Sequence, residues 1–292
     1  DDEVITAANT FVATVGAIAE VGAIPVFVDC DDTFCIDAGK IEEAISEKTK
    51  AIIPVHYTGY MADLRKIGPV ANRYGIPIVE DACQAILSAI DGKTAGTWGK
   101  TGAFSLHPLK NLNVWADGGV IVTDDSEIYA SLKLIRNHGL LDRDTVAILG
   151  CNSRLDTIQA VVGNWLLPTT HEITKKRIVN ATYYDNAFRG ISEITIPTRP
   201  SDYQIVYHLY MVLAKRRDEL LKYCIANGIE AKIHYPIPVH LQQAAESLEY
   251  QEGDLPFTEA DAKEIITLPA HQHLQDDQIQ YAIDKIRDFY TE

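Results

Sequence analysis

Long apolar segments and positive charge are both scarce in this chain of 292 residues. No apolar run approaches the roughly 20 residues that a membrane span requires, and no basic segment precedes an apolar core as in a secretory signal. Lysine and arginine number 26 against 41 aspartates and glutamates, which gives a net charge of -15. This balance argues against nucleic acid and anionic membrane surfaces as partners, and we expect a cytoplasmic protein.

Paired cysteines are also missing. The five cysteines are odd in number, and they show neither CxxC spacing nor a neighbouring histidine cluster. A disulfide framework and a structural zinc are therefore not expected, and no metal site is predicted. The chain has no internal repeats or low-complexity segments, and 47% of its residues are hydrophobic. Its length suits one large domain and one small one.

The most informative stretch runs from residue 74 to residue 123. An apolar run, residues 76–79, predicts a buried parallel strand that ends in Glu80 and Asp81. A second strand is expected at 103–106 and a third at 120–123, with Lys110 in the turn between them. Because open α/β sheets bind ligands at the carboxyl ends of their strands, we expect Asp81 and Lys110 at one sheet edge.

These two residue types suit one kind of chemistry. A lysine on a partly apolar loop loses hydration, and its lowered pKa can make it an amine nucleophile. A strand-end aspartate is the usual partner of the ring nitrogen of pyridoxal phosphate (PLP). Most lysines are nevertheless solvated surface groups and most such aspartates form caps or turns, so the pair alone is weak evidence.

The remaining pattern alternates strands and helices, which predicts right-handed crossovers and a mostly parallel sheet. Asn9 or Thr10 is expected to cap a helix at 11–21, and Asp37 a helix ending near residue 46. A long helix from 154 is expected to kink or break at Pro168. The other expected elements are strands at 23–29 and 50–56, helices at 61–74 and 124–139, and a final amphipathic helix.

Six separated motifs together resemble the DegT/DnrJ/StrS family of sugar aminotransferases, in the family's order and over nearly the full chain. They are EDACQA (80–85), GAFSLHPLKNL (102–112), ADGGVIVTDD (116–125), LIRNHGL (134–140), CNSRLDTIQA (151–160) and GIEAKIHYPIPVHLQ (228–242). The resemblance implies the aspartate aminotransferase fold, which is the PLP-dependent fold type I of the α/β class. We therefore expect a three-layer large domain with a mostly parallel sheet at 1–183 and a smaller α+β domain at 184–292.

The resemblance also implies roles for single residues. Lys110 would be the catalytic amine that carries PLP, and Asp81 the partner of the ring nitrogen. The other implied cofactor contacts are Gln84 near the ring hydroxyl, Ser105 at the phosphate, Phe11 stacked on the ring, and Asn152 reaching the phosphate of the other subunit in a homodimer. His234 and Tyr235 in IHYP, and His138 in LIRNHGL, are the implied substrate contacts.

Some of these residues also have simpler interpretations. Phe11 could be a core aromatic residue, and Asn152 a helix cap. His56, which ends the strand at 50–56, is better interpreted as a buried histidine bonded to a loop than as a site residue. The family also carries a Gly-Thr segment that cradles the phosphate before the point where this sequence begins. That segment is absent from the sequence, so we expect either a fragment or a chain that lacks part of the cofactor site.

By this resemblance, the expected reaction moves an amino group, with glutamate as donor, to a keto group of a nucleotide-linked sugar. A related branch removes a sugar hydroxyl and has a histidine in place of the lysine, so Lys110 favours transamination. Two alternatives stay open. One is an aminotransferase for a cyclitol or another keto substrate, and the other is a catalytically inert relative with the same fold.

Overall fold

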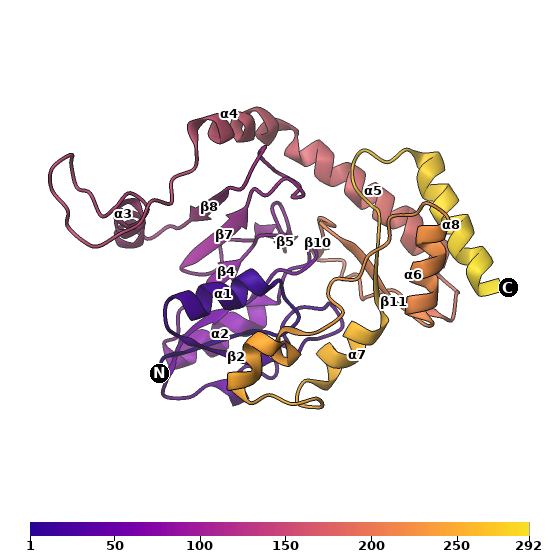
Figure 1. Ribbon diagram of the computed structural model, residues 1–292, viewed down its shortest axis with the longest axis horizontal. Helices are drawn as coiled ribbons and strands as arrows, with labels where there is room; N and C mark the ends of the chain where they lie inside the picture. The colour runs from indigo at the N-terminus through magenta and orange to yellow at the C-terminus, as the bar shows by residue number, and fades with distance from the viewer. Residues whose placement is uncertain (292) are drawn as a thin grey trace.

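The computed structural model describes residues 1–291, and a mostly parallel sheet lies at its centre (Figure 1). Strands β2 (Ile24–Val28), β1 (Glu3–Ala7) and β3 (Thr49–Ile53) pair in parallel in that order. Strands β4 (Val79–Asp81) and β7 (Thr101–Ser105) continue the parallel run, and β8 (Gly119–Val122) closes it as an antiparallel edge. Two parallel bridges, Ile52–Ile78 and Val55–Asp81, connect β3 to β4. The predicted parallel sheet is confirmed.

Helices α1 (Val12–Glu20) and α2 (Leu64–Tyr74) lie beside this sheet (Figure 1). The predicted caps of α1 are wrong, because Phe11 occupies the N-cap position and no side chain caps the helix there. The hydroxyl of Thr10 instead shares a hydrogen bond with that of Thr14, one turn into α1. A hydrogen bond between two buried hydroxyl groups thus stabilises the N-terminus of this helix.

The helix expected after Asp37 is also wrong, since only a short 3-10 turn, Glu42–Ala44, forms there. The Asp37 carboxylate accepts a hydrogen bond from the Gly39 N–H at 2.8 Å, and its carbonyl accepts one from the Lys40 N–H. Such local side-chain bonds offer the backbone an alternative to a helix. The turn is sufficient to bury Ile41 completely, so the apolar pattern is satisfied without a helix.

A second, antiparallel sheet forms from strands β9 (Ile194–Thr195), β11 (Tyr210–Ala214) and β12 (Ile265–Leu268). Around it lie α5 (Thr170–Phe188), α6 (Arg217–Ala226), α7 (Pro256–Glu264) and α8 (Asp276–Thr291), with α8 packed on both α5 and α6. The expected domain boundary at residue 183 falls inside α5. One cluster of buried residues extends from Ile5 to Phe289, so the two sheets share a continuous core. A small antiparallel sheet joins β5 (Ala89–Ile90), β6 (Lys93–Thr94) and β10 (Tyr203–Gln204).

Residues 126–156 form an arm that projects away from the body of the molecule (Figure 1). The arm begins with α3 (Ser126–Ile135), which has no buried residues, and leads into α4 (Thr157–Leu166). A 3-10 turn, Leu167–Thr169, then separates α4 from α5, so the predicted break at Pro168 is confirmed.

Among the helices of residues 1–291, none is both long enough and apolar enough to cross a bilayer.

Asp29 connects the large sheet to α7 across more than 220 residues of sequence. Its carboxylate follows β2, is 2% exposed, and accepts hydrogen bonds from the N–H groups of Phe257 and Thr258 and from the Thr258 hydroxyl. Lys40 Nζ lies 3.0 Å from its Oδ2 atom. Burial raises the pKa of Asp29, but these hydrogen bonds outweigh it and leave the pKa below its usual value. The carboxylate is thus a helix cap held in its ionised form.

We expect Asp29→Ala to lower the free energy of unfolding by about 2–4 kcal/mol, because it removes the cap of α7 and the ion-pair partner of Lys40. Urea unfolding at pH 7 measures the loss, with exposed Glu43→Ala as the control. Because the folded pKa of Asp29 is depressed, its contribution is present above the unfolded pKa and disappears as the pH falls through the folded pKa. The difference between wild type and variant should therefore shrink in acid, and a difference that is constant with pH would contradict this account.

Candidate active site

The carboxyl ends of β1, β3, β4 and β7 meet at one edge of the large sheet, and Asp81, Gln84, Ser105 and Lys110 follow or end strands at this edge. Side chains alternate between the two faces of a strand, so the two carboxylates that end β4 point opposite ways. Glu80 is fully buried, and its carboxylate accepts hydrogen bonds from His56 and from the N–H groups of Gly96, Trp98 and Gly99. His56 is therefore a buried structural residue, as expected, and only Asp81 is left to face the site.

Two donors hold the Asp81 carboxylate in place. The Thr14 hydroxyl donates to its Oδ2 atom at 2.7 Å, and the Cys83 N–H donates to Oδ1 at 3.1 Å. Thr14 also pairs with Thr10 at 2.8 Å, so the first turn of α1 braces the carboxylate from the side. A carboxylate that accepts two such bonds is fixed in orientation.

Lys110 lies in the loop after β7, where a tight turn joins its N–H to the His107 carbonyl at 2.8 Å. The side chain is half-buried, and its Nζ atom lies 3.5 Å from Nε2 of His208. Burial lowers the pKa of the Lys110 amine, and the nearby Cys83 and Asp81 only partly oppose this shift. Lys110 is thus a partly desolvated amine close enough to Asp81 to interact with its charge.

Aromatic rings and a histidine line the same side. Phe11 is 52% exposed, which excludes the interpretation as a core aromatic residue, and its ring centroid lies 6.0 Å from that of Tyr235. The hydroxyl of Tyr57 donates to the His234 carbonyl, and the His234 ring bonds the Thr267 hydroxyl at 2.9 Å. The charge of Lys110 also contributes to the lowered pKa of His234, after burial and Lys232. His234 is therefore close enough to Lys110 to respond to its charge, and the Tyr235 ring lies between those of His234 and Phe11, with centroid distances of 5.4 Å and 6.0 Å.

Gln84 and Ser105 are also at this edge, but both already make local bonds. The Gln84 side-chain oxygen accepts the Thr58 N–H at 2.7 Å, which leaves its NH₂ group as the available donor. The Ser105 hydroxyl oxygen accepts the His107 N–H at 3.2 Å, and its own proton stays available for an acceptor. Both can thus donate one further hydrogen bond.

Asn152 and His138 lie elsewhere, on the projecting arm. Both side chains are exposed, and a backbone bridge connects Asn152 to Asn137. The N-cap of α4 is Asp156, so Asn152 does not cap that helix. Both residues therefore lie away from the sheet edge that carries Lys110 (Figure 1).

Four residues around Lys110 and Asp81 were not predicted from the sequence. They are Thr14, Tyr57, Arg177 and His208. Thr14 repeats Thr10 at a spacing of four, which is one helical turn, and this was the only local sign of its pairing. The other three reach the site through long-range packing, and no local pattern marks them.

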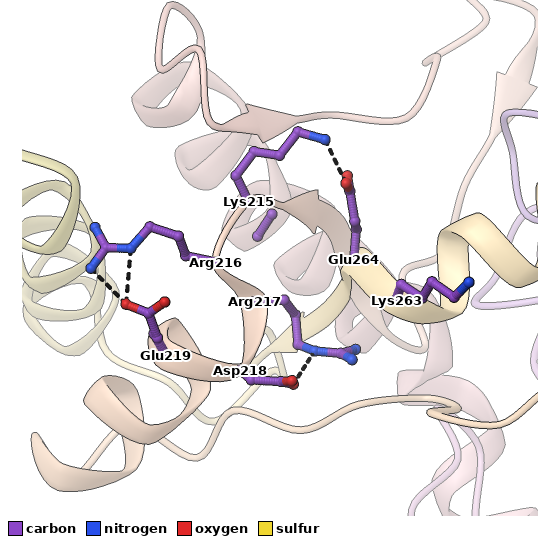
Figure 2. A pocket seen from close by; sticks show the side chains of 8 residues that line it. Lys215, Arg216, Arg217, Asp218, Glu219, Lys263 and Glu264 are labelled. Carbon is purple, nitrogen blue, oxygen red and sulfur yellow. Dashed lines mark hydrogen bonds and ion pairs between the residues drawn. The ribbon is translucent and has the colours of Figure 1, made fainter.

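An open pocket elsewhere collects four basic side chains between β11, α6 and α7. Figure 2 shows three ion pairs, Lys215 with Glu264, Arg216 with Glu219 and Arg217 with Asp218. The fourth basic side chain, Lys263, pairs with Glu252 at 3.2 Å. These ion pairs neutralise most of its positive charge, and no chemistry is assigned to it. Within residues 1–291, no group of three or more His, Cys, Asp or Glu side chains is arranged to hold a metal ion.

The residues at the sheet edge fit pyridoxal phosphate. An amine of lowered pKa suits attachment to an aldehyde, and a carboxylate held by two donors suits a protonated ring nitrogen. Phe11 offers an exposed aromatic ring for stacking, and Gln84 and Ser105 can each donate one further hydrogen bond to the cofactor. The donor set thus satisfies the needs of this cofactor on chemical grounds.

Comparison with known proteins gives close relatives. The chain is 42% identical over 292 residues to a "Pleiotropic regulatory protein" of Geobacillus stearothermophilus, covering 99% of this chain and 78% of that protein. It is 37% identical to a dTDP-3-amino-3,4,6-trideoxy-alpha-D-glucose transaminase of Streptomyces venezuelae, covering 99% of this chain and 76% of that one. The sequence is therefore similar to a named transaminase over nearly its whole length.

Solved structures agree. The crystal structure of S. venezuelae DesV in complex with a ketimine intermediate matches with a TM-score of 0.97 and 36% identity, covering 100% of this chain and 79% of that one. The PLP-form of a putative sugar aminotransferase from Streptococcus pneumoniae matches with a TM-score of 0.92 and 27% identity, covering 99% of this chain and 81% of that one. The predicted fold class is confirmed, and pyridoxal phosphate is the cofactor of this group of structures. Because the model of the DegT/DnrJ/EryC1/StrS aminotransferase family also matches residues 1–287, the chain belongs to that family.

Proposed function

We propose that this protein is a PLP-dependent aminotransferase that moves an amino group, with glutamate as donor, to a keto group of a nucleotide-linked sugar. The single observation that carries the proposal is that the half-buried Lys110 amine lies close enough to the Asp81 carboxylate for their charges to interact, while Thr14 and Cys83 hold that carboxylate. The names of the relatives support the substrate class, since they include transaminases of dTDP-linked and UDP-linked sugars.

In this proposal each residue has a distinct task. When bound, pyridoxal phosphate supplies a ring that accepts electrons from the substrate carbon. Lys110 holds the cofactor covalently and, once released, its free amine moves the proton at the substrate carbon. Asp81 keeps the ring nitrogen protonated, while Gln84 and Ser105 donate to the ring hydroxyl and the phosphate. Phe11 covers one face of the ring, and His234 and Tyr235 contact the substrate.

The proposed function includes a homodimer in which Asn152 and His138 serve the neighbouring subunit. Two features of the arm support this. The arm projects from the body, and it exposes apolar side chains, among them Leu149 at 99% and Leu141 at 63%. Exposed apolar surface of this kind commonly marks a protein interface. Sedimentation equilibrium should give a dimer, and a monomer at working concentration would contradict this part of the proposal.

The reaction itself is tested by incubating the protein with pyridoxal phosphate, glutamate and a panel of keto sugars linked to dTDP or UDP. We expect a mass increase in one sugar nucleotide that matches replacement of its keto oxygen by an amino group. Free keto sugars and keto cyclitols serve as controls, and conversion of a cyclitol alone would favour the alternative substrate class. If no keto substrate gains an amine, the enzymatic function is wrong.

A non-catalytic role deserves a direct comparison, because the 42% identical relative is named a regulatory protein. Borohydride reduction separates the two functions at the level of the cofactor. In an enzyme, reduction should fix pyridoxal phosphate on the peptide that contains Lys110. An inert relative should leave that peptide unlabelled.

A further inference from the structure

The segment before β11 is held firmly against the site. The Val206 N–H donates to the Gly59 carbonyl at 3.3 Å and the Leu209 N–H to the Thr58 carbonyl at 3.1 Å. From the other side, the Asn111 side chain donates to the Val206 carbonyl at 3.1 Å. Asn111 is the residue after Lys110, so the lysine loop and this segment are joined directly.

A buried arginine fixes the next two residues. Arg177 of α5 is 6% exposed, and its Nη1 atom donates to the carbonyls of Tyr207 at 3.2 Å and His208 at 3.1 Å. Tyr207 has a φ of +48°, a backbone conformation that residues other than glycine rarely adopt. Such strain persists where the surroundings dictate the backbone, and it often lies at functional sites. Gly59 permits the close approach, because a Cβ atom there would lie 2.8 Å from the Tyr207 nitrogen.

This backbone presents the His208 ring to Lys110. Its Nε2 atom lies 3.5 Å from Lys110 Nζ, while its Nδ1 atom is buried and has no hydrogen-bond partner among the described residues. Buried N–H groups without an acceptor are rarer than buried acceptors without a donor. The proton of the neutral ring therefore belongs on Nε2, and the bare lone pair on Nδ1.

Burial favours the neutral forms of both His208 and Lys110. Burial is the main cause that lowers the pKa of His208, and Lys110, Arg177, His234 and His107 all lower it further. Burial likewise lowers the pKa of Lys110, with Cys83 and Asp81 acting in the opposite direction. An ammonium group has no lone pair, so an Nε2–H group can bond only to the neutral amine.

We propose that His208 is a positioning residue for Lys110. Its Nε2–H group donates a hydrogen bond to the neutral Lys110 amine and so directs the lone pair of that amine. This inference rests on the proposed role of Lys110 as the amine that carries the cofactor and moves the proton. The bond would keep the amine unprotonated and aimed while it is free. His208 itself would transfer no proton to the substrate.

The tautomer can be measured in the wild-type protein without cofactor. Histidine labelled with ¹⁵N reports which ring nitrogen carries the proton, and His208→Gln identifies the signal. We expect the Nε2–H tautomer at neutral pH. The Nδ1–H tautomer, or a doubly protonated ring, would overturn the proposal. Since neither cofactor nor turnover enters this measurement, its failure is distinct from failure of the proposed function.

A matched pair of variants tests the effect on Lys110. His208→Gln keeps an N–H donor, whereas His208→Met has a similar volume and no donor. Labelling of the cofactor-free protein with acetic anhydride over a range of pH, followed by mass spectrometry of the Lys110 peptide, gives the pKa of the amine. We expect this pKa to rise by about half a unit to one unit in the methionine variant relative to wild type, the equivalent of one ordinary hydrogen bond.

Turnover of the holoenzyme is the second readout of this pair. We expect kcat to fall about tenfold in His208→Met with KM nearly unchanged, while His208→Gln stays within about threefold of wild type. The pH at which activity is half-maximal should move upward in the methionine variant only. Equal impairment of the two variants, or an unchanged Lys110 pKa in His208→Met, would show that His208 contributes only shape.

Discussion

Replacement of Lys110 with alanine should abolish turnover, with a loss of about 10⁴-fold or more, because one amine is proposed both to hold the cofactor and to move the proton. The measurement is the rate of amino transfer with saturating pyridoxal phosphate and the best sugar nucleotide of the panel. Lys110→Arg should be equally inactive, since a guanidinium stays protonated and cannot attack an aldehyde. The loss thus follows from the chemistry of the amine and not from its charge.

Two controls separate this loss from damage to the fold. Exposed Lys100→Ala removes a lysine at the surface and should keep wild-type activity. The Lys110 side chain has His208 as its only hydrogen-bond partner among the described residues, so Lys110→Ala should unfold in urea within about 1 kcal/mol of wild type. A small primary amine in the buffer should restore part of the proton transfer. A Lys110→Ala variant with native turnover would exclude the proposed mechanism.

Asp81→Asn is expected to lower kcat/KM by about 10²- to 10⁴-fold, although the two side chains have the same shape. A carboxylate stabilises a protonated ring nitrogen, whereas a neutral amide does not, so the ring would accept electrons poorly. The change should appear in the rate of the first half-reaction with glutamate, followed by the absorbance of the bound cofactor. Binding of the cofactor should weaken much less than the rate falls.

Thr14→Val is the matched control for Asp81. It keeps the carboxylate and removes the hydroxyl that donates to Oδ2 at 2.7 Å, so it changes orientation and not charge. We expect a loss of about tenfold or less, the equivalent of one hydrogen bond to a charged group. If Thr14→Val were as inactive as Asp81→Asn, the main effect would be the geometry of the carboxylate. If both were near wild type, Asp81 would have no part in the reaction.

Local sequence patterns predicted most of the large sheet and the break before α5. Parallel buried strands are continuous apolar runs, and proline removes a backbone donor, so both leave a clear signal. The predicted helix after Asp37 failed because a side-chain turn at Gly39 competes with it, and apolar spacing does not register such competition. The cap of α1 failed for a related reason, since Thr10 pairs with Thr14 and leaves the backbone uncapped.

The linear sequence was sufficient to predict the family resemblance, the parallel sheet, and the placement of Asp81 and Lys110 after adjacent strands at one sheet edge. Those features depend on residue type and on short-range spacing, which the linear order of the chain records directly. Packing between distant segments, in contrast, turns Glu80 inward and brings Asp81 to Thr14. It also lets Asn111 hold the Val206 carbonyl and Arg177 the His208 carbonyl, which leaves the His208 ring beside Lys110. These contacts join residues that are 16 to 98 positions apart in the sequence, so they exist only once packing has brought the segments together.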